Sequence, residues 1–472
     1  MLVGKDVDDK FPAKHLFSNV LYFIKWRNTL SSIKITYENN SYLVKLTVIA
    51  FMIFFSTFFL NLFLSKHLTT AVYGDLMLGI KLITVVSGII TLGTAQGVKK
   101  YFPSYIKNGD VTQALQYLRW NIKIVILASF LLLVFVTIML IMFYLLGFLD
   151  ANGLSGPHIS WLMIIFAPLS AGVSICSAYL LIYRGYVLSF ILNRFVQNLI
   201  IIAVFFLCIY WLEWVITDYS IVAVMFISLL FSFLIIAATL TKSSADFNEI
   251  TIRKIMEQNL SVGKDWFKYS LQGLLSTIVM MLYFTLDLLI LEVVHPEEEA
   301  VGKYAAVLAV TGIMYIVPKN IYKNFSVSIG SCFEEGKIAY LQQELNRLNI
   351  FTGIYSFIFA IIVVVFSHFF LKIFGHGYTD VTLPLIIVAI AAGIQNFATP
   401  AKLLLFYGGR QKLVIGINVT LLTILVVFGS LFVYWWGIIG IAIATAVAYV
   451  LEVCFCVFFV RAQLNIKLFG IF

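Results

Sequence analysis

The chain has 472 residues and a formal net charge of +9; 61% of its residues are hydrophobic and only 12% are charged. Soluble globular domains are nearer half apolar and a quarter charged, so this composition excludes a large soluble catalytic domain. A mean hydropathy of +0.99 indicates a membrane protein. The basic residues lie in short loops, where they suit anionic lipid, so we expect membrane lipids and no nucleic acid as partners.

Long apolar segments follow one another along almost the whole chain. A helix needs about 20 apolar residues to cross a bilayer. The sequence therefore predicts an all-α polytopic membrane protein with twelve spans. They lie near 43–64, 75–97, 122–147, 159–183, 188–211, 219–240, 268–292, 303–329, 350–374, 380–407, 412–434 and 437–460.

Lysine and arginine lie almost entirely in every second gap between these spans. The other gaps hold only Lys66, Lys303 and, at a span edge, Lys372. Cytoplasmic loops are enriched in Lys and Arg, so both chain ends are predicted to be cytoplasmic. The basic tail before the first span fits either an interfacial helix or a disordered segment. The predicted divisions are tail 1–42, six-helix bundle 43–240, linker 241–267, six-helix bundle 268–460 and C-terminal tail 461–472.

The two halves share short motifs in the same order. YGD at 73–75 matches GKY at 302–304, and RWN at 119–121 matches RLN at 347–349. Six spans per half give both halves the same orientation. This predicts a parallel repeat about an axis along the membrane normal, with a cavity between the halves.

Several stretches resemble those of one transporter family. They are YGD at 73–75, LGTA at 92–95, LDLLI at 286–290, VGKY at 301–304 and WGIIGIAIAT at 436–445. The order of these motifs and the predicted topology make the chain resemble one family over about residues 43–460. This is the polysaccharide transport, or O-antigen flippase, family of the multidrug/oligosaccharidyl-lipid/polysaccharide (MOP) exporter superfamily.

The resemblance implies two six-helix bundles around a V-shaped cavity, as in MOP and MATE transporters, in the cytoplasmic (inner) membrane. It implies a flippase that moves a polyprenyl-diphosphate-linked oligosaccharide outward by alternating access, for O-antigen, capsule or exopolysaccharide synthesis. The lipid-linked oligosaccharide and the polysaccharide polymerase machinery are then the expected partners. No cofactor is expected, and the sequence has no G-x-x-x-x-G-K-[ST] phosphate loop.

Ionisable groups inside membrane spans are costly, so each is a functional candidate. A diphosphate needs cations and a glycan needs hydrogen-bonding groups. Lys319 lies roughly 24 Å along its span at 1.5 Å per residue, and Lys323 lies one turn further on the same face. With Lys81, Arg194 and Asn198 they are the predicted substrate-binding residues. Snorkelling to the interface is the alternative for Lys81 and Lys323, and interhelical hydrogen bonding for Asn198.

Asp287 and Glu452 are the ion-coupling candidates. Asp287 could pair with Lys81, take a proton during transport, or form a static ion pair. Glu452 has the same alternatives and no evident partner, while Lys402 is expected to extend to the cytoplasmic interface. Four aromatic residues at predicted outer span ends are expected to form an interfacial belt: Tyr73, Tyr304, Trp435 and Trp436.

Two other functions remain open. A cation-coupled multidrug exporter of the same superfamily would favour an acidic cavity, whereas lysines outnumber carboxylates here. A membrane-embedded polysaccharide polymerase, ligase or acyltransferase would need catalytic residues on an outer loop or a His/Asp pair, and we find neither. We therefore expect no enzyme activity. None of the five cysteines has metal-site spacing, so no metal is expected.

Overall fold

The computed structural model describes residues 47–107, 110–145, 159–213, 217–245, 264–334 and 336–468. Residues Ile49–Phe472 form one compact unit. The predicted N-terminal tail, 1–42, and most of the predicted linker, 241–267, lie outside the described residues. The described residues are helical with short connections and contain no strand.

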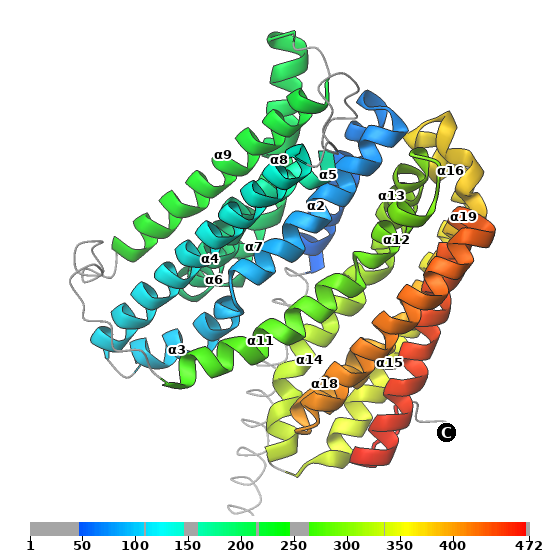
Figure 1. Ribbon diagram of the computed structural model, residues 1–472. Helices are drawn as coiled ribbons and strands as arrows, with labels where there is room; N and C mark the ends of the chain where they lie inside the picture. The colour runs from blue at the N-terminus through cyan, green and yellow to red at the C-terminus, as the bar shows by residue number, and fades with distance from the viewer. Residues whose placement is uncertain are drawn as a thin grey trace, which may run out of the picture. The chain divides into compact units, whose positions relative to one another are not determined.

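The helices of the first half begin with Thr47–His67, and Figure 1 labels most of those that follow. In chain order they are α2 (Thr70–Ile90), α3 (Thr94–Lys107), α4 (Val111–Leu145), α5 (Ile159–Leu162), η1 (Met163–Phe166), α6 (Ala167–Arg184), α7 (Tyr186–Phe190), η2 (Ile191–Val196), α8 (Gln197–Phe206), η3 (Leu207–Trp211) and α9 (Asp218–Ala245). Several of these labels share one continuous span: α5 to α6 form span four, and α7 to η3 form span five.

The second half is more often interrupted. It comprises α11 (Lys264–Tyr283), α12 (Leu286–Val294), α13 (Glu299–Thr311), η4 (Gly312–Tyr315), α14 (Ile316–Glu334), α15 (Ile338–Val365), α16 (Ser367–Phe374), η5 (His376–Val381), α17 (Thr382–Gln395), α18 (Ala398–Tyr407) and α19 (Gln411–Leu464). Span seven is broken, because α11 and α12 meet at an angle of 51°.

Ten helices of the described residues are long and apolar enough to cross a membrane, and the bent pair α11–α12 makes eleven. The last of them, α19, has 54 residues, or roughly 80 Å at 1.5 Å per residue, far more than a bilayer core of about 30 Å. Gly437 interrupts it with φ of 54° and ψ of −129°. A Cβ on Gly440 would lie 1.9 Å from the Phe432 carbonyl oxygen, so the chain folds back there. Counting α19 as two spans gives the predicted twelve.

The matched motifs of the two halves make matching contacts. Asn121 is buried on α4, and its side chain donates to the Tyr179 hydroxyl at 3.2 Å. Asn349, its counterpart on α15, accepts from the Tyr322 hydroxyl at 2.8 Å. A buried Asn bonded to a Tyr on a neighbouring helix therefore occurs in both halves, which supports the internal repeat.

The prediction of an aromatic belt is wrong for two of its four members. Tyr73 and Tyr304 are fully buried. The Tyr73 hydroxyl donates to Asn61 at 2.8 Å, and that of Tyr304 to Thr445 at 3.3 Å. A phenol whose hydroxyl finds a partner is stable in a core, so these two residues pack helices together. Trp435 and Trp436 are exposed, as a belt requires.

The two halves touch closely where α2 meets α13. A Cβ on Gly74 would lie 2.5 Å from the Gly302 nitrogen, and one on Gly302 would lie 2.0 Å from the Thr70 carbonyl oxygen. Only glycine allows backbones to approach so closely. This contact lies at the end of the spans predicted to face outward.

The helix α11 contacts both halves. Its first turn places Trp266 among aromatic residues of α3 and α4, where the Trp266 indole donates to the Tyr105 hydroxyl at 2.8 Å. Its last residue, Tyr283, donates to Glu452 on α19 at 3.3 Å. The bend after Tyr283 therefore lies where the helix leaves one half and joins the other.

Candidate functional site

Two predicted cations from different halves lie close to each other. Arg194 is on η2 of span five, and Lys319 is in the first turn of α14. Both side chains are exposed, and the Lys319 ammonium lies within range of the Arg194 charge. Two exposed cations from the two halves are therefore near enough to feel each other's charge.

Local breaks in helix geometry accompany both residues. Arg194 lies within a π-helical stretch, Ile191–Val196, a geometry often found at functional sites. Lys319 follows the 3₁₀ turn η4 and Pro318, which has no amide hydrogen to donate. Such interruptions inside a membrane are tolerated where helices line a cavity or pack on protein.

Neither cation has a carboxylate partner in the part of the chain that the structure describes. Within the described ranges, Arg194 and Lys319 form no ion pair with an acidic side chain. Lys303, by contrast, pairs with Glu299 and Asp380, and Lys402 pairs with Glu452. Two nearby positive charges without a counter-charge repel each other. An anion between them would relieve that repulsion.

The remaining predicted binding residues are placed differently. Lys323 lies one turn beyond Lys319 on α14, but its side chain is outside the described residues. Asn198 is buried and donates to the hydroxyls of Ser56 and Thr57, at 3.1 and 2.8 Å. Its amide therefore joins span five to span one, which is the interhelical alternative.

Lys81 and Asp287 are brought together at the break in span seven. The Lys81 ammonium on α2 donates to the Phe284 carbonyl oxygen and lies within range of the Asp287 charge. Asp287, in the first turn of α12, is buried and accepts from the Leu288 amide at 2.9 Å. Lys81 thus donates a hydrogen bond to a carbonyl oxygen that has no helical partner at the break. This hydrogen bond links the two halves.

Glu452 has a partner that the sequence did not reveal. It is buried on α19 and forms an ion pair with Lys402 of α18. The expectation that Lys402 extends to the interface is therefore wrong, because a nearby buried carboxylate holds its ammonium. Glu452 also accepts from Gln395 at 2.7 Å and from Tyr283 at 3.3 Å. Gln395 in turn accepts from Tyr315 at 2.7 Å.

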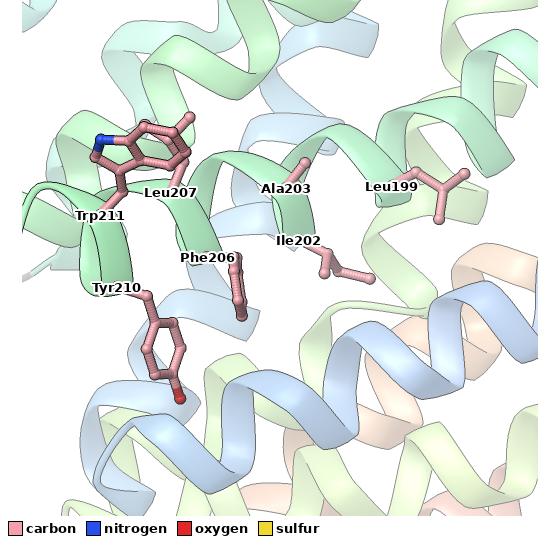
Figure 2. Close-up of a pocket in the computed structure, with 7 residues that line it drawn as sticks. All are labelled: Leu199, Ile202, Ala203, Phe206, Leu207, Tyr210 and Trp211. Carbon is pink, nitrogen blue, oxygen red and sulfur yellow. The ribbon is translucent and has the colours of Figure 1, made fainter.

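An open apolar groove of about 690 Å³ lies on the surface of span five, beyond Arg194. Figure 2 shows its seven lining side chains, all from α8 and η3, with Ile202, Phe206 and Tyr210 pointing the same way. Most of these side chains are well exposed, and Trp211 is 82% exposed. Exposed apolar surface on a spanning helix suits contact with lipid. No group of three His, Cys, Asp or Glu residues that could hold a metal lies within the described residues.

The apolar helices define a multi-pass membrane protein. The chain is similar to an inward-facing multidrug resistance MATE family transporter of the MOP superfamily: TM-score 0.66, 13% identity, covering 89% of this chain and 95% of the other. It is also similar to an outward-facing multidrug resistance MATE family transporter of the MOP superfamily, with TM-score 0.64 and 14% identity, covering 90% of this chain and 95% of the other.

A third solved structure is the Vibrio cholerae MATE transporter VcmN in the bent form, with TM-score 0.55, 15% identity and coverages of 90% and 98%. No family model matches the sequence, and no curated protein matches it. The chain therefore has the fold of MATE transporters of the MOP superfamily, and this likeness shows the fold alone.

Proposed function

We propose that this protein is an exporter of an anionic lipid-linked substrate, of the polyprenyl-diphosphate-linked oligosaccharide class, working by alternating access for surface polysaccharide synthesis. The observation that carries the proposal is the pair Arg194 and Lys319, two exposed cations from opposite halves that lie within range of each other's charge. Arginine forms bidentate hydrogen bonds with phosphate, and lysine binds it as a compact charge.

The balance of charged side chains within the spans supports a negatively charged substrate. The two buried carboxylates each have a lysine nearby: Asp287 has Lys81, and Glu452 has Lys402. Once these are matched, Arg194 and Lys319 remain as cations without acidic partners in the described residues. A substrate that carries negative charge complements this arrangement, whereas an organic cation would be repelled by it.

The experiment is glycan export in cells that make a surface polysaccharide through this protein. Deletion is expected to abolish surface glycan and to leave glycan-linked polyprenyl diphosphate in the inner leaflet. Lys319→Ala and Arg194→Ala are expected to do the same at normal protein level. Lys372→Ala is the matched control, because Lys372 is an exposed lysine on α16, away from this pair. Normal surface glycan in both Lys319→Ala and Arg194→Ala contradicts the proposal.

Export of organic cations is the second candidate, since the solved structures with this fold include transporters described as multidrug resistance proteins. The buried carboxylates Asp287 and Glu452 are the groups that such a function would use. Deletion would then raise sensitivity to cationic drugs and leave surface glycan unchanged. The same deletion strain therefore distinguishes the two candidates.

A further inference from the structure

We infer that Asn396 and Tyr355 are positioning residues for Lys319. Their side chains bind two backbone carbonyl groups at the break in span eight, and so fix the direction in which the next turn of α14 presents Lys319. This role rests on the proposed function, because Lys319 is one of the two cations proposed to bind the substrate headgroup.

The break in span eight leaves a backbone carbonyl without its usual donor. Span eight changes from α13 to the 3₁₀ turn η4 and then to α14, with Pro318 in the first turn of α14. In a regular α-helix the amide of residue 318 would donate to the carbonyl of Met314, four residues earlier. Proline has no amide hydrogen, so Met314 needs another donor, because an unsatisfied carbonyl inside a membrane is costly.

Side chains from two other spans supply donors at this break. Asn396 follows α17 in span ten, and its amide donates to the Met314 carbonyl oxygen at 3.0 Å and to the Ser356 hydroxyl at 2.8 Å. Tyr355 on α15, in span nine, donates its hydroxyl to the Ile313 carbonyl oxygen at 2.7 Å. Two carbonyl groups of η4 are therefore bound by neighbouring helices.

Lys319 lies between two anchored points of the same span. The Met314 carbonyl comes before it. Tyr322, three residues after it, is fully buried and donates its hydroxyl to Asn349 on α15 at 2.8 Å. Successive residues of an α-helix are turned by about 100° around its axis, so anchors on both sides fix the direction in which Lys319 points. In that direction its ammonium lies within range of the Arg194 charge from the first half.

Neither positioning residue is accessible to a substrate. Asn396 and Tyr355 are 2% and 8% exposed, and their donors already have protein acceptors. Lys319, by contrast, is exposed. Loss of either hydrogen bond should therefore affect substrate only through the lysine: η4 rearranges around the freed carbonyl, and Lys319 moves relative to Arg194.

Crosslinking tests this placement without any substrate. In a full chain that lacks the native cysteines, Arg194→Cys and Lys319→Cys are joined by bifunctional thiol reagents of graded length, and the shortest effective reagent is used. Tyr355→Phe, which removes only the hydroxyl, and Asn396→Leu should each lower the crosslinking yield severalfold. Tyr73→Phe is the matched control, because it removes a buried hydroxyl that donates within the first half, and it should keep the yield.

An unchanged yield in Tyr355→Phe or in Asn396→Leu overturns the role of that residue. An equal loss in the Tyr73→Phe control overturns both roles, and so does a parent pair that no reagent joins. If Asn396→Leu does not fold, adding Pro318→Ala should restore folding, because the alanine amide can donate to the Met314 carbonyl. A fold that is not restored contradicts the role of Asn396.

Binding of undecaprenyl diphosphate in nanodiscs shows whether the Tyr355 hydroxyl acts through the lysine. Tyr355→Phe should weaken binding severalfold in the chain that has Lys319 and have no effect in Lys319→Gln, which keeps Arg194. Equal weakening in both chains would show a general structural role and overturn the inference. If the wild-type protein does not bind this lipid, the proposed function fails, whereas the crosslinking yields still decide whether the two residues position Lys319.

Discussion

Replacing Gly302 by alanine should push the two halves apart at the contact between α2 and α13. The new Cβ would lie 2.0 Å from the Thr70 carbonyl oxygen, whereas ordinary contacts begin at 3.4 Å. The backbones must therefore separate locally by the difference, 1.4 Å. The atom that is met belongs to the backbone of α2, so no side chain rotation relieves the clash.

The energetic consequence is that of overpacking a tight contact, about 1–3 kcal/mol. At about 1.4 kcal/mol for each factor of ten, the closed contact becomes roughly fivefold to 150-fold less favourable relative to a separated one. Gly302→Ala should therefore raise the population of molecules in which the predicted outer ends are apart.

Spin labels measure this separation directly. Trp211 and Val293 are 82% and 74% exposed, at the ends of η3 and α12, so cysteines there carry labels without disturbing packing. In a background without the native cysteines, Gly302→Ala should shift the distance distribution between them to longer values. Gly377→Ala is the matched control, because its Cβ would meet the Thr70 side chain at an ordinary 3.8 Å. Identical distributions for Gly302→Ala and this control would refute the reasoning.

Three further predictions concern stability and local motion. Glu452→Gln and Lys402→Met should each lower the free energy of unfolding by about 3–5 kcal/mol, nearer the lower figure because Lys402 is partly exposed. The double variant should lower it by less than the sum of the two single effects. Denaturant unfolding in detergent measures these changes, and additive effects would contradict the prediction. Asn349→Ala removes the hydrogen-bond partner that Asn349 provides to the buried Tyr322 hydroxyl and Leu468 carbonyl. It should lower the free energy of unfolding by about 1–3 kcal/mol in the same assay, and an unchanged denaturation midpoint would contradict this prediction. Lys81→Met should speed amide hydrogen exchange around Phe284, and unchanged exchange there would show that Lys81 does not stabilise the bend.

The spans were predictable because length and hydropathy alone decide whether a helix can cross a bilayer. The bend between α11 and α12 was not, since Phe284 and Thr285 include neither proline nor glycine. Tyr73 and Tyr304 were misplaced because a tyrosine at a span end looks the same in sequence whether it faces lipid or another helix. The end of a span is visible in the sequence, but the face of the helix that packs is not.

The candidate site was predictable residue by residue, but not as an arrangement. The cost of burying charge singles out Lys319 and Arg194 as readily as Lys402 and Glu452. Which charges pair depends on how spans far apart in sequence pack together. Only the structure shows that Lys402 and Glu452 pair with each other, while Lys319 lies within range of the Arg194 charge from the other half.

The central claim is that Arg194 and Lys319 bind an anionic lipid headgroup, and direct binding tests it most simply. Purified protein in nanodiscs is titrated with undecaprenyl diphosphate and, separately, with the organic cation ethidium, at low and high salt. The account predicts salt-sensitive binding of the lipid diphosphate that Arg194→Gln/Lys319→Gln abolishes and Lys372→Gln keeps, with weak ethidium binding. Tight ethidium binding, with lipid diphosphate binding absent or unchanged in the double variant, would contradict it.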